Sequence, residues 1–215
     1  MHGAGHRLTS GEPAEGAGVE SDRIKWNSRF ASQESFLGRR PSPFLAREIE
    51  RIKVLVPGRR ALDIACGEGR NSVFLATHGF RVTGLDISEV GLAKAARRAA
   101  EAGVTVEFVH ADLDHVRPAG RFDLVLNFNF LQRPLIPVEV ELLTPGGVLL
   151  FDTILATPAV PPTGNPDFYL RPGELLRLFA GYDGEILFHE ESDAGDLPTA
   201  RLMFRKKNCC PDDGM

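Results

Sequence analysis

Two glycines and one acid mark the stretch of this chain that is best equipped for ligand chemistry. The segment ALDIACGEGRN, residues 61–71, is an apolar run that ends at Gly67 and Gly69, and Asp63 lies inside it. Glycines allow a backbone to approach a ligand without an intervening side chain. A helix that follows such a loop presents free N–H groups to an anionic part of the ligand. Ser72 occupies the position of the third glycine of a dinucleotide loop, so we expect a ligand without a pyrophosphate.

Two further acids stand where strands are expected to end. Asp86 ends the segment RVTGLD, and a carboxylate at that place can accept hydrogen bonds from both hydroxyls of a ribose. Asp112, in HADLD, can accept from an exocyclic amine such as that of adenine, while the Leu113 backbone contacts the ring. The alternatives are a helix-start role for Asp86 and a helix-cap or turn role for Asp112.

The next expected strand, FDLVLNF, ends in polar and aromatic residues, Asn127, Phe128 and Asn129, where a reaction centre would lie. Together these strand ends describe an adenosine with a free ribose diol, joined to an amino-acid-like part in place of phosphates. Asp63 then has a use, because a carboxylate under the glycine loop attracts an ammonium group and repels a phosphate.

Alternating strand and helix patterns must position these residues. Apolar strand runs are expected at 60–65, 81–86, 104–110, 122–128 and 147–153, followed by two closing strands at 184–191 and 199–206. Helical spacing lies between them, and a broken helix and turn cover 131–147. The pattern predicts an α/β fold with a doubly wound, mostly parallel seven-stranded sheet. The last connection is short enough for a hairpin, so the last strand should run antiparallel.

The ends of the chain have a different composition. Residues 1–21 are rich in Gly, Glu, Ser and Ala, and we expect a disordered N-terminal tail. A single domain should span 22–207, with helices at 22–57 that cover the ligand site, and 208–215 should form a C-terminal tail. The Pro-rich stretch at 156–171 is long for a connection in one domain, and such loops are often functional.

Charge and composition exclude several classes of function. The formal net charge is −4 and the basic pairs are scattered, which argues against a nucleic-acid partner. No apolar run approaches the ~20 residues of a membrane span, and no signal peptide is recognisable, so we expect a cytoplasmic protein. Three cysteines without framework spacing argue against a disulfide scaffold. We interpret Cys66 as a small buried residue, and we predict no metal site.

The combined motifs resemble those of class I S-adenosylmethionine-dependent methyltransferases. The resemblance rests on LDIACGEGRN, VTGLDIS, HADLD, FDLVLNF and LLTPGGVLLFDT, which cover residues 60–152, and the closing strands extend it to about 206. The forms GEGRNS and WNSRF are most similar to a small-molecule branch, that of tellurite-resistance-type and thiopurine-type methyltransferases. The resemblance implies a Rossmann-like methyltransferase fold, S-adenosylmethionine as cofactor and S-adenosylhomocysteine as product.

The resemblance also implies roles for individual residues. Gly67 and Gly69 would pass the methionine part, Asp86 would hold the ribose, and Arg29 would lie near the methionine carboxylate on an N-terminal helix. The full set expected at the cofactor is Arg29, Asp63, Ala65, Cys66, Gly67, Gly69, Asn71, Asp86, Ile87, Asp112, Leu113, Asn127 and Phe128. The acceptor pocket is expected to include Trp26, Phe36, Asn129 and Tyr169. Packing and surface charge are the alternatives for Trp26 and Arg29, and anchoring of the Pro-rich loop is the alternative for Tyr169.

A small acceptor fits the sequence best. The cofactor supplies the electrophile, so alignment of the acceptor in line with the methyl group is the main task of the protein. A thiolate or soft anion needs no general base, and no acid/base pair stands out. Two other functions stay open: an RNA- or protein-directed methyltransferase, and a non-catalytic module that binds S-adenosylmethionine or an NAD-type ligand. The chain is expected to act as a monomer or homodimer.

Overall fold

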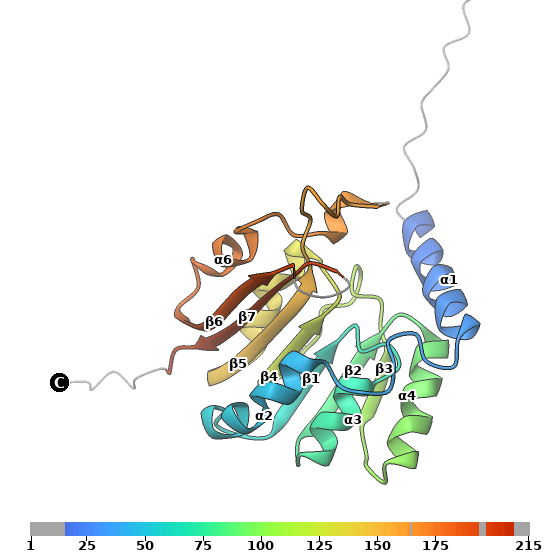
Figure 1. Ribbon diagram of the computed structural model, residues 1–215. Coiled ribbons are helices and arrows are strands. Elements are labelled where there is room, and N and C mark those ends of the chain that lie inside the picture. The colour runs from blue at the N-terminus through green and yellow to red at the C-terminus, as the bar shows by residue number, and fades with distance from the viewer. Residues whose placement is uncertain (1–15, 164, 194–196, 209–215) are drawn as a thin grey trace, which may run out of the picture.

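A single sheet brings the expected site residues to one edge of the molecule. The structure, a computed structural model, describes residues 16–163, 165–193 and 197–208, and only the backbone of 16–20. Within these residues the sheet has seven strands in the order β3-β2-β1-β4-β5-β7-β6 (Figure 1). Their bounds are β1 Arg60–Ile64, β2 Arg81–Asp86, β3 Glu107–His110, β4 Phe122–Phe128, β5 Leu143–Ile154, β6 Gly184–Ser192 and β7 Thr199–Lys206.

The strand directions confirm the predicted topology. β1 to β5 pair in parallel, and β7 runs antiparallel to both of its neighbours, β5 and β6. The carboxyl ends of β1, β2 and β4 therefore lie at one edge, and the residues that follow them face the same region of space. The chain order changes direction between β1 and β4, which is where a doubly wound sheet binds its ligand.

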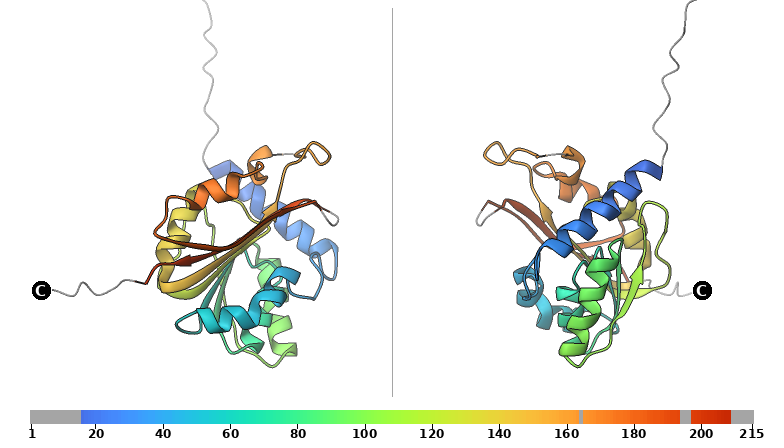
Figure 2. Two further views of the ribbon diagram at one scale, coloured as in Figure 1. Left: turned by 60° about the vertical axis from the view of Figure 1, so that its left-hand side comes forward. Right: turned by 90° about the vertical axis from the view of Figure 1, so that its right-hand side faces the viewer.

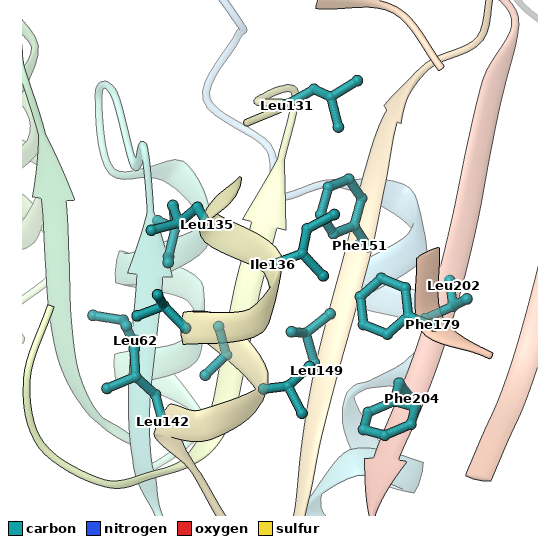
Figure 3. Packing of buried hydrophobic residues seen from close by; sticks show 14 of the residues in the cluster. Leu62, Leu131, Leu135, Ile136, Leu142, Leu149, Phe151, Phe179, Leu202 and Phe204 are labelled. Carbon is teal, nitrogen blue, oxygen red and sulfur yellow. The ribbon is translucent and has the colours of Figure 1, made fainter. Parts of the chain in front are cut away.

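Helices cover both faces of the sheet. α2 (Pro43–Leu55), α3 (Arg70–Thr77) and α4 (Glu89–Glu101) lie on one face, and α5 (Ile136–Leu142) and α6 (Glu174–Phe179) on the other (Figures 1 and 2). Each face has its own apolar cluster. Figure 3 shows the α5 side, where Leu135, Ile136 and Leu142 point toward Leu62 and Leu149 of the sheet. Because helices cover both faces, all seven residues of β4 are buried, the polar Asp123 and Asn127 included.

Helix α1 corrects the expected start of the domain. It spans Gly16–Ser32, so residues 16–21, which we expected to be disordered, are helical. Residues 21–32 pack along α4, and a helix that is already nucleated extends at little cost. Residues 1–15 and 209–215 lie outside the described part of the chain, which leaves the rest of both predicted tails, and Cys209 with Cys210, without a structural account.

Two strand boundaries also differ from expectation. β3 begins at Glu107, three residues later than the apolar pattern indicated. β5 begins at Leu143, although Pro145 and Gly146 were read as part of a turn. The register with β4 shifts at this point, because Leu143 pairs with Phe122 and the next pair joins Val148 to Leu124. The four residues 144–147 thus form a bulge within the strand.

Candidate functional site

The loop after β1 has a backbone that favours residues without a large side chain. Ala65, Gly67 and Gly69 all have positive φ angles, of 51°, 54° and 73°. Gly69 precedes α3, and a Cβ atom added there would lie 2.7 Å from Cβ of Ala95, so the close contact between α3 and α4 requires a glycine. The left-handed conformation costs a residue such as Ala65 roughly 1–2 kcal/mol. Strain of this kind concentrates where a loop serves a ligand.

Asp63 lies under this loop and is buried. The Ser72 hydroxyl donates a hydrogen bond of 2.5 Å to Asp63 Oδ2. Burial raises the pKa of the Asp63 carboxyl to about 7, against the opposing effects of Ser72 and the Arg70 charge. Ser72, which stands where a dinucleotide loop has its third glycine, therefore binds Asp63. We did not predict this pairing from the sequence.

Asp86 ties the end of β2 to the glycine loop. Its two carboxylate oxygens accept hydrogen bonds from the backbone N–H groups of Gly67, at 2.7 Å, and Ser88, at 2.8 Å. Burial raises the pKa of this carboxyl, and the two backbone donors oppose the rise. Each oxygen retains a second lone pair for a ligand hydroxyl. The carbonyl of Ile87, the next residue, lies 2.9 Å from His110 Nε2.

Cys66 is buried in the same loop, as expected. Burial, together with the negative charges of Asp63 and Asp86, raises the pKa of its thiol well above the usual value. A thiol without thiolate character is a poor nucleophile. Its part in the loop is a backbone hydrogen bond of 2.8 Å, which the Cys66 N–H donates to the carbonyl of Leu85.

Asp112 forms a local turn. Oδ1 accepts from the backbone N–H of Asp114 and Oδ2 lies within hydrogen-bond distance of His115 Nδ1, both at 2.9 Å. This is the turn role that we weighed as the alternative, and the contact with an adenine amine stays a prediction. Leu113 packs against the apolar cluster on the α5 side.

Asn71 and Phe128, both expected at the cofactor, contact residues at the start of α2. Asn71 Oδ1 accepts from the backbone N–H of Ser42 at 2.9 Å, which fixes the entry into α2. Phe128 packs on Phe44 of α2, with ring centroids 6.3 Å apart. Asn129, by contrast, is exposed beyond the end of β4 and has a positive φ of 57°.

The side chain of Asn127 is buried at the end of β4. Its Nδ2 donates a hydrogen bond of 2.6 Å to Oε1 of Glu139 on α5. The amide oxygen of Asn127, Oδ1, and the second carboxyl oxygen of Glu139, Oε2, are buried without a hydrogen-bond partner among the described residues. Sequence reasoning missed Glu139, because a helix pattern does not show which charged residue will be buried.

The C-terminal half of α1 covers the glycine loop with aromatic side chains. The Phe30 ring lies 3.1 Å from the position of a Cβ atom at Gly67 and 3.0 Å from one at Gly91. Trp26 stacks on Phe30 with centroids 5.7 Å apart, and Arg29 lies 5.0 Å above the Trp26 ring.

Phe36 completes this group, with edge contacts to Trp26 and Phe30. We call Trp26, Phe30 and Phe36 the aromatic cap. Trp26, Arg29 and Phe36 were expected at the site. Phe30 was not among the expected site residues, although its spacing of four from Trp26 places it on the same helix face.

Glu68, between the two glycines, binds the cap segment. It is 3% exposed and accepts from the backbone N–H of Phe36 at 2.9 Å and from the Ser35 hydroxyl at 3.1 Å. Lys94 pairs with its other oxygen at 3.1 Å and also donates to the carbonyls of Phe30, Gln33 and Glu34. The loop and the cap are thus joined by one buried carboxylate. A charged residue between two glycines was the signal that sequence reasoning passed over.

The Pro-rich loop at 156–171 lies near α1 in space, although the two segments are far apart in the sequence (Figure 1). The Phe168 ring lies 5.3 Å from Nζ of Lys25. Arg133 donates to the carbonyls of Asp167 and Tyr169, at 2.7 and 3.0 Å, and pairs with Glu174 at 2.7 Å. The Tyr169 hydroxyl bonds Thr163 within the loop, which supports the anchoring role weighed for this residue.

Metal-binding clusters and membrane-spanning helices are both absent from the described residues. No cluster of three or more His, Cys, Asp or Glu side chains could hold a metal ion there. In the same part of the chain, no helix has the length and apolar character needed to cross a membrane.

Known proteins are similar to this chain in sequence and in fold. Residues 61–147 match the family described as a methyltransferase domain. A ubiquinone biosynthesis O-methyltransferase of Nitrosococcus oceani is 30% identical over 141 residues, which are 55% of this chain and 60% of that protein. The chain spans between about two fifths and three fifths of the length of the curated relatives it matches.

Solved structures show the same fold at low sequence identity. TehB from Haemophilus influenzae superposes with a TM-score of 0.65 at 22% identity, covering 75% of this chain and 62% of that one. The magnesium protoporphyrin IX methyltransferase ChlM from Synechocystis, solved with bound S-adenosylmethionine, has a TM-score of 0.64 at 18% identity, covering 88% of this chain and 97% of that one. The predicted Rossmann-like methyltransferase fold is confirmed.

Proposed function

We propose, from the match of residues 61–147 to a methyltransferase-domain family, that this protein transfers the methyl group of S-adenosylmethionine to a small-molecule acceptor. One observation carries the proposal: the buried Asp86 carboxylate is bonded to the Gly67 N–H, so that an acid and a side-chain-free backbone stand together at the sheet edge. A ribose diol and the chain of a linked amino acid fit this pair.

The chemistry of the surrounding groups suits the cofactor. Asp63 lies under the loop and favours an ammonium group, while a phosphate would be repelled. Arg29, held over the Trp26 ring, offers a guanidinium to the methionine carboxylate. Asp112 and Leu113 would border the adenine. When bound, S-adenosylmethionine supplies an electrophilic methyl group on a sulfonium cation.

The protein's contribution is then enclosure and alignment. The aromatic cap excludes water from the loop, since Phe30 lies directly over Gly67. Alignment of an acceptor with the methyl group can supply roughly 7–11 kcal/mol of the barrier. The two histidines nearest the site are engaged locally, His110 with the Ile87 carbonyl and His115 with Asp112, which supports an acceptor that needs no strong base.

The acceptor enters between α1 and the Pro-rich loop in this proposal. Trp26 and Phe36 contact each other on the α1 side, and Phe168 of the loop lies near Lys25 of α1, so their aromatic faces favour a flat, apolar acceptor. Phenols belong to this class, and the relative from N. oceani is named as an O-methyltransferase. A thiol is the second acceptor to test.

Calorimetry tests cofactor binding directly. We expect S-adenosylmethionine to bind the wild-type protein, and Asp86→Ala to abolish detectable binding. Asp183→Ala is the control, because that acid is largely exposed and pairs only with Lys207 at 3.5 Å. Saturation by NAD without binding of S-adenosylmethionine would overturn the proposal.

Incubation with labelled S-adenosylmethionine then identifies the acceptor. A panel of phenols, thiols, metalloid oxyanions and halides should show transfer to one class. Labelling of RNA or of a protein, with none of the small molecules labelled, would contradict the small-molecule assignment.

A further inference from the structure

The buried pair of Asn127 and Glu139 has polar atoms that the fold alone does not use. Both side chains are 0% exposed, and they share one hydrogen bond of 2.6 Å. Asn127 Oδ1 and Glu139 Oε2 have no partner among the described residues. Each unpaired buried polar atom costs about 1–3 kcal/mol. A site that retains two of them in an otherwise apolar layer calls for a functional reason.

Glu139 lies on the face of α5 that packs against the sheet. It is three residues after Ile136 and three before Leu142, both of which point inward in Figure 3. No cation among the described residues balances it, and burial raises the pKa of its carboxyl to about 8. At neutral pH Glu139 is therefore a neutral partner of the amide.

Asn127 belongs to the edge of the sheet at which the cofactor is proposed to bind. Its backbone pairs with Ile64, the last residue of β1, and the strained Ala65 and the glycine loop follow directly. The backbone of Asn127 is thus one strand away from the start of the turn that the proposed function assigns to the methionine part. The side-chain NH₂ group is engaged by Glu139, which leaves the carbonyl end of the amide as the free end.

We propose that Glu139 is a positioning residue that holds the Asn127 amide with its oxygen toward the cationic sulfur of the cofactor, so that the site prefers S-adenosylmethionine to the neutral product. The inference rests on the proposed function. A fixed carbonyl dipole attracts a cation strongly in a buried, low-dielectric place, and it attracts an uncharged thioether much less. Preference for the charged form favours exchange of the spent cofactor for a fresh one.

The test compares the dissociation constants of S-adenosylmethionine and S-adenosylhomocysteine by calorimetry. In Glu139→Leu the amide loses its anchor, and we expect the preference for the sulfonium to fall roughly tenfold. Glu139→Gln keeps a neutral acceptor for the Asn127 NH₂ group and should restore the wild-type ratio. Glu141→Gln, on the exposed side of the same helix, is the matched control. Circular dichroism confirms that each variant is folded.

Asn127→Ala provides a second, independent arm. It should lower the ratio as much as Glu139→Leu does, and the double variant should show no further loss, because both changes remove one oriented oxygen. If Glu139→Leu does not fold, the same ratio of dissociation constants is compared between Asn127→Ala and Asn127→Asp. The carboxylate added in Asn127→Asp should strengthen the preference for the sulfonium, and the loss of the oxygen in Asn127→Ala should weaken it.

Distinct results overturn the two proposals. An unchanged ratio in Glu139→Leu or Asn127→Ala, with both ligands still bound, overturns the positioning role and leaves the proposed function standing. A ratio that rises in Asn127→Ala also overturns it, because the NH₂ group would then be the end that faces the cofactor. A wild-type protein that binds neither ligand overturns the proposed function, and this inference with it.

Discussion

Replacement of Glu68 by glutamine tests whether the buried carboxylate joins the glycine loop to the aromatic cap. The substitution keeps the size of the side chain and one acceptor oxygen, but it removes the negative charge. Lys94 and Arg98, at 3.1 and 3.8 Å from the carboxylate, then lose their anionic partner. Their side chains are only 16% and 12% exposed, so water cannot replace the lost charge fully.

The magnitude follows from these contacts. Removal of one partner of a buried ion pair costs about 3–5 kcal/mol. Lys94 retains its hydrogen bonds to three backbone carbonyls, and the glutamine can still accept from the Phe36 N–H, so we place the loss at the lower end, about 3 kcal/mol. For a domain of this size the melting temperature should fall by roughly 6–12 °C.

Thermal unfolding and limited proteolysis are the assays. The segment 33–41 should become the first site of cleavage in Glu68→Gln, because the cap is released from the loop. Glu34→Gln is the control, since its side chain is 94% exposed and its pair with Arg39 is 3.9 Å long. The coupling of loop and cap would be refuted if Glu68→Gln had the same melting temperature as Glu34→Gln and its segment 33–41 stayed resistant to proteolysis.

Three further outcomes are expected. Glu139 has a pKa of about 8 when folded and 4.5 when unfolded, so the folded chain binds the extra proton between these values and stability falls as pH rises through them. Urea unfolding from about pH 5 to pH 8 should show a slope shallower by up to ~1.4 kcal/mol per pH unit in Glu139→Gln, and equal slopes would disprove the raised pKa. Phe30→Ala should lower the unfolding free energy by about 3–4 kcal/mol in urea titration, and it should weaken S-adenosylmethionine binding. Phe168→Ala is the control, because Phe168 is 44% exposed, and its unfolding free energy should stay within ~0.5 kcal/mol of the wild type. In a chain whose Cys209 and Cys210 are replaced by serine, Cys66 should react with a thiol reagent only on unfolding, and rapid labelling of the native protein would contradict its burial.

The sheet and the glycine loop could be predicted because they depend on local patterns. Apolar runs of five to seven residues marked β1, β2 and β4, and Gly67 and Gly69 stand where positive φ angles occur. The bulge at 144–147 could not be predicted, since Pro145 and Gly146 are typical of turns and only the register with β4 decides that the strand continues.

The charged residues inside the site follow a different rule. Glu68 and Glu139 look like surface residues in the sequence, and each is buried by a separate element of the fold, the cap segment for Glu68 and β4 for Glu139. Asp112 illustrates the converse, because its partners Asp114 and His115 are local and a turn was foreseeable. A turn can be read from the sequence because its partners are neighbours in the chain, whereas the burial of a charged side chain depends on how separate elements pack.

The antiparallel placement of β7 has a consequence for how this protein can diverge. Thr199 pairs with both Ile154 and Ser192, so the end of β6 and the start of β7 lie at the same sheet edge as the end of β5. The Pro-rich loop, which follows β5, begins at this edge as well. The Pro-rich loop, the ends of β6 and β7, and α1 are separate segments of the chain, and none of them takes part in the pairing of β1 with β2 and β4. Insertions or exchanges in these segments can therefore change the acceptor side of the proposed site while the pairing of the strands that carry the glycine loop and Asp86 stays intact.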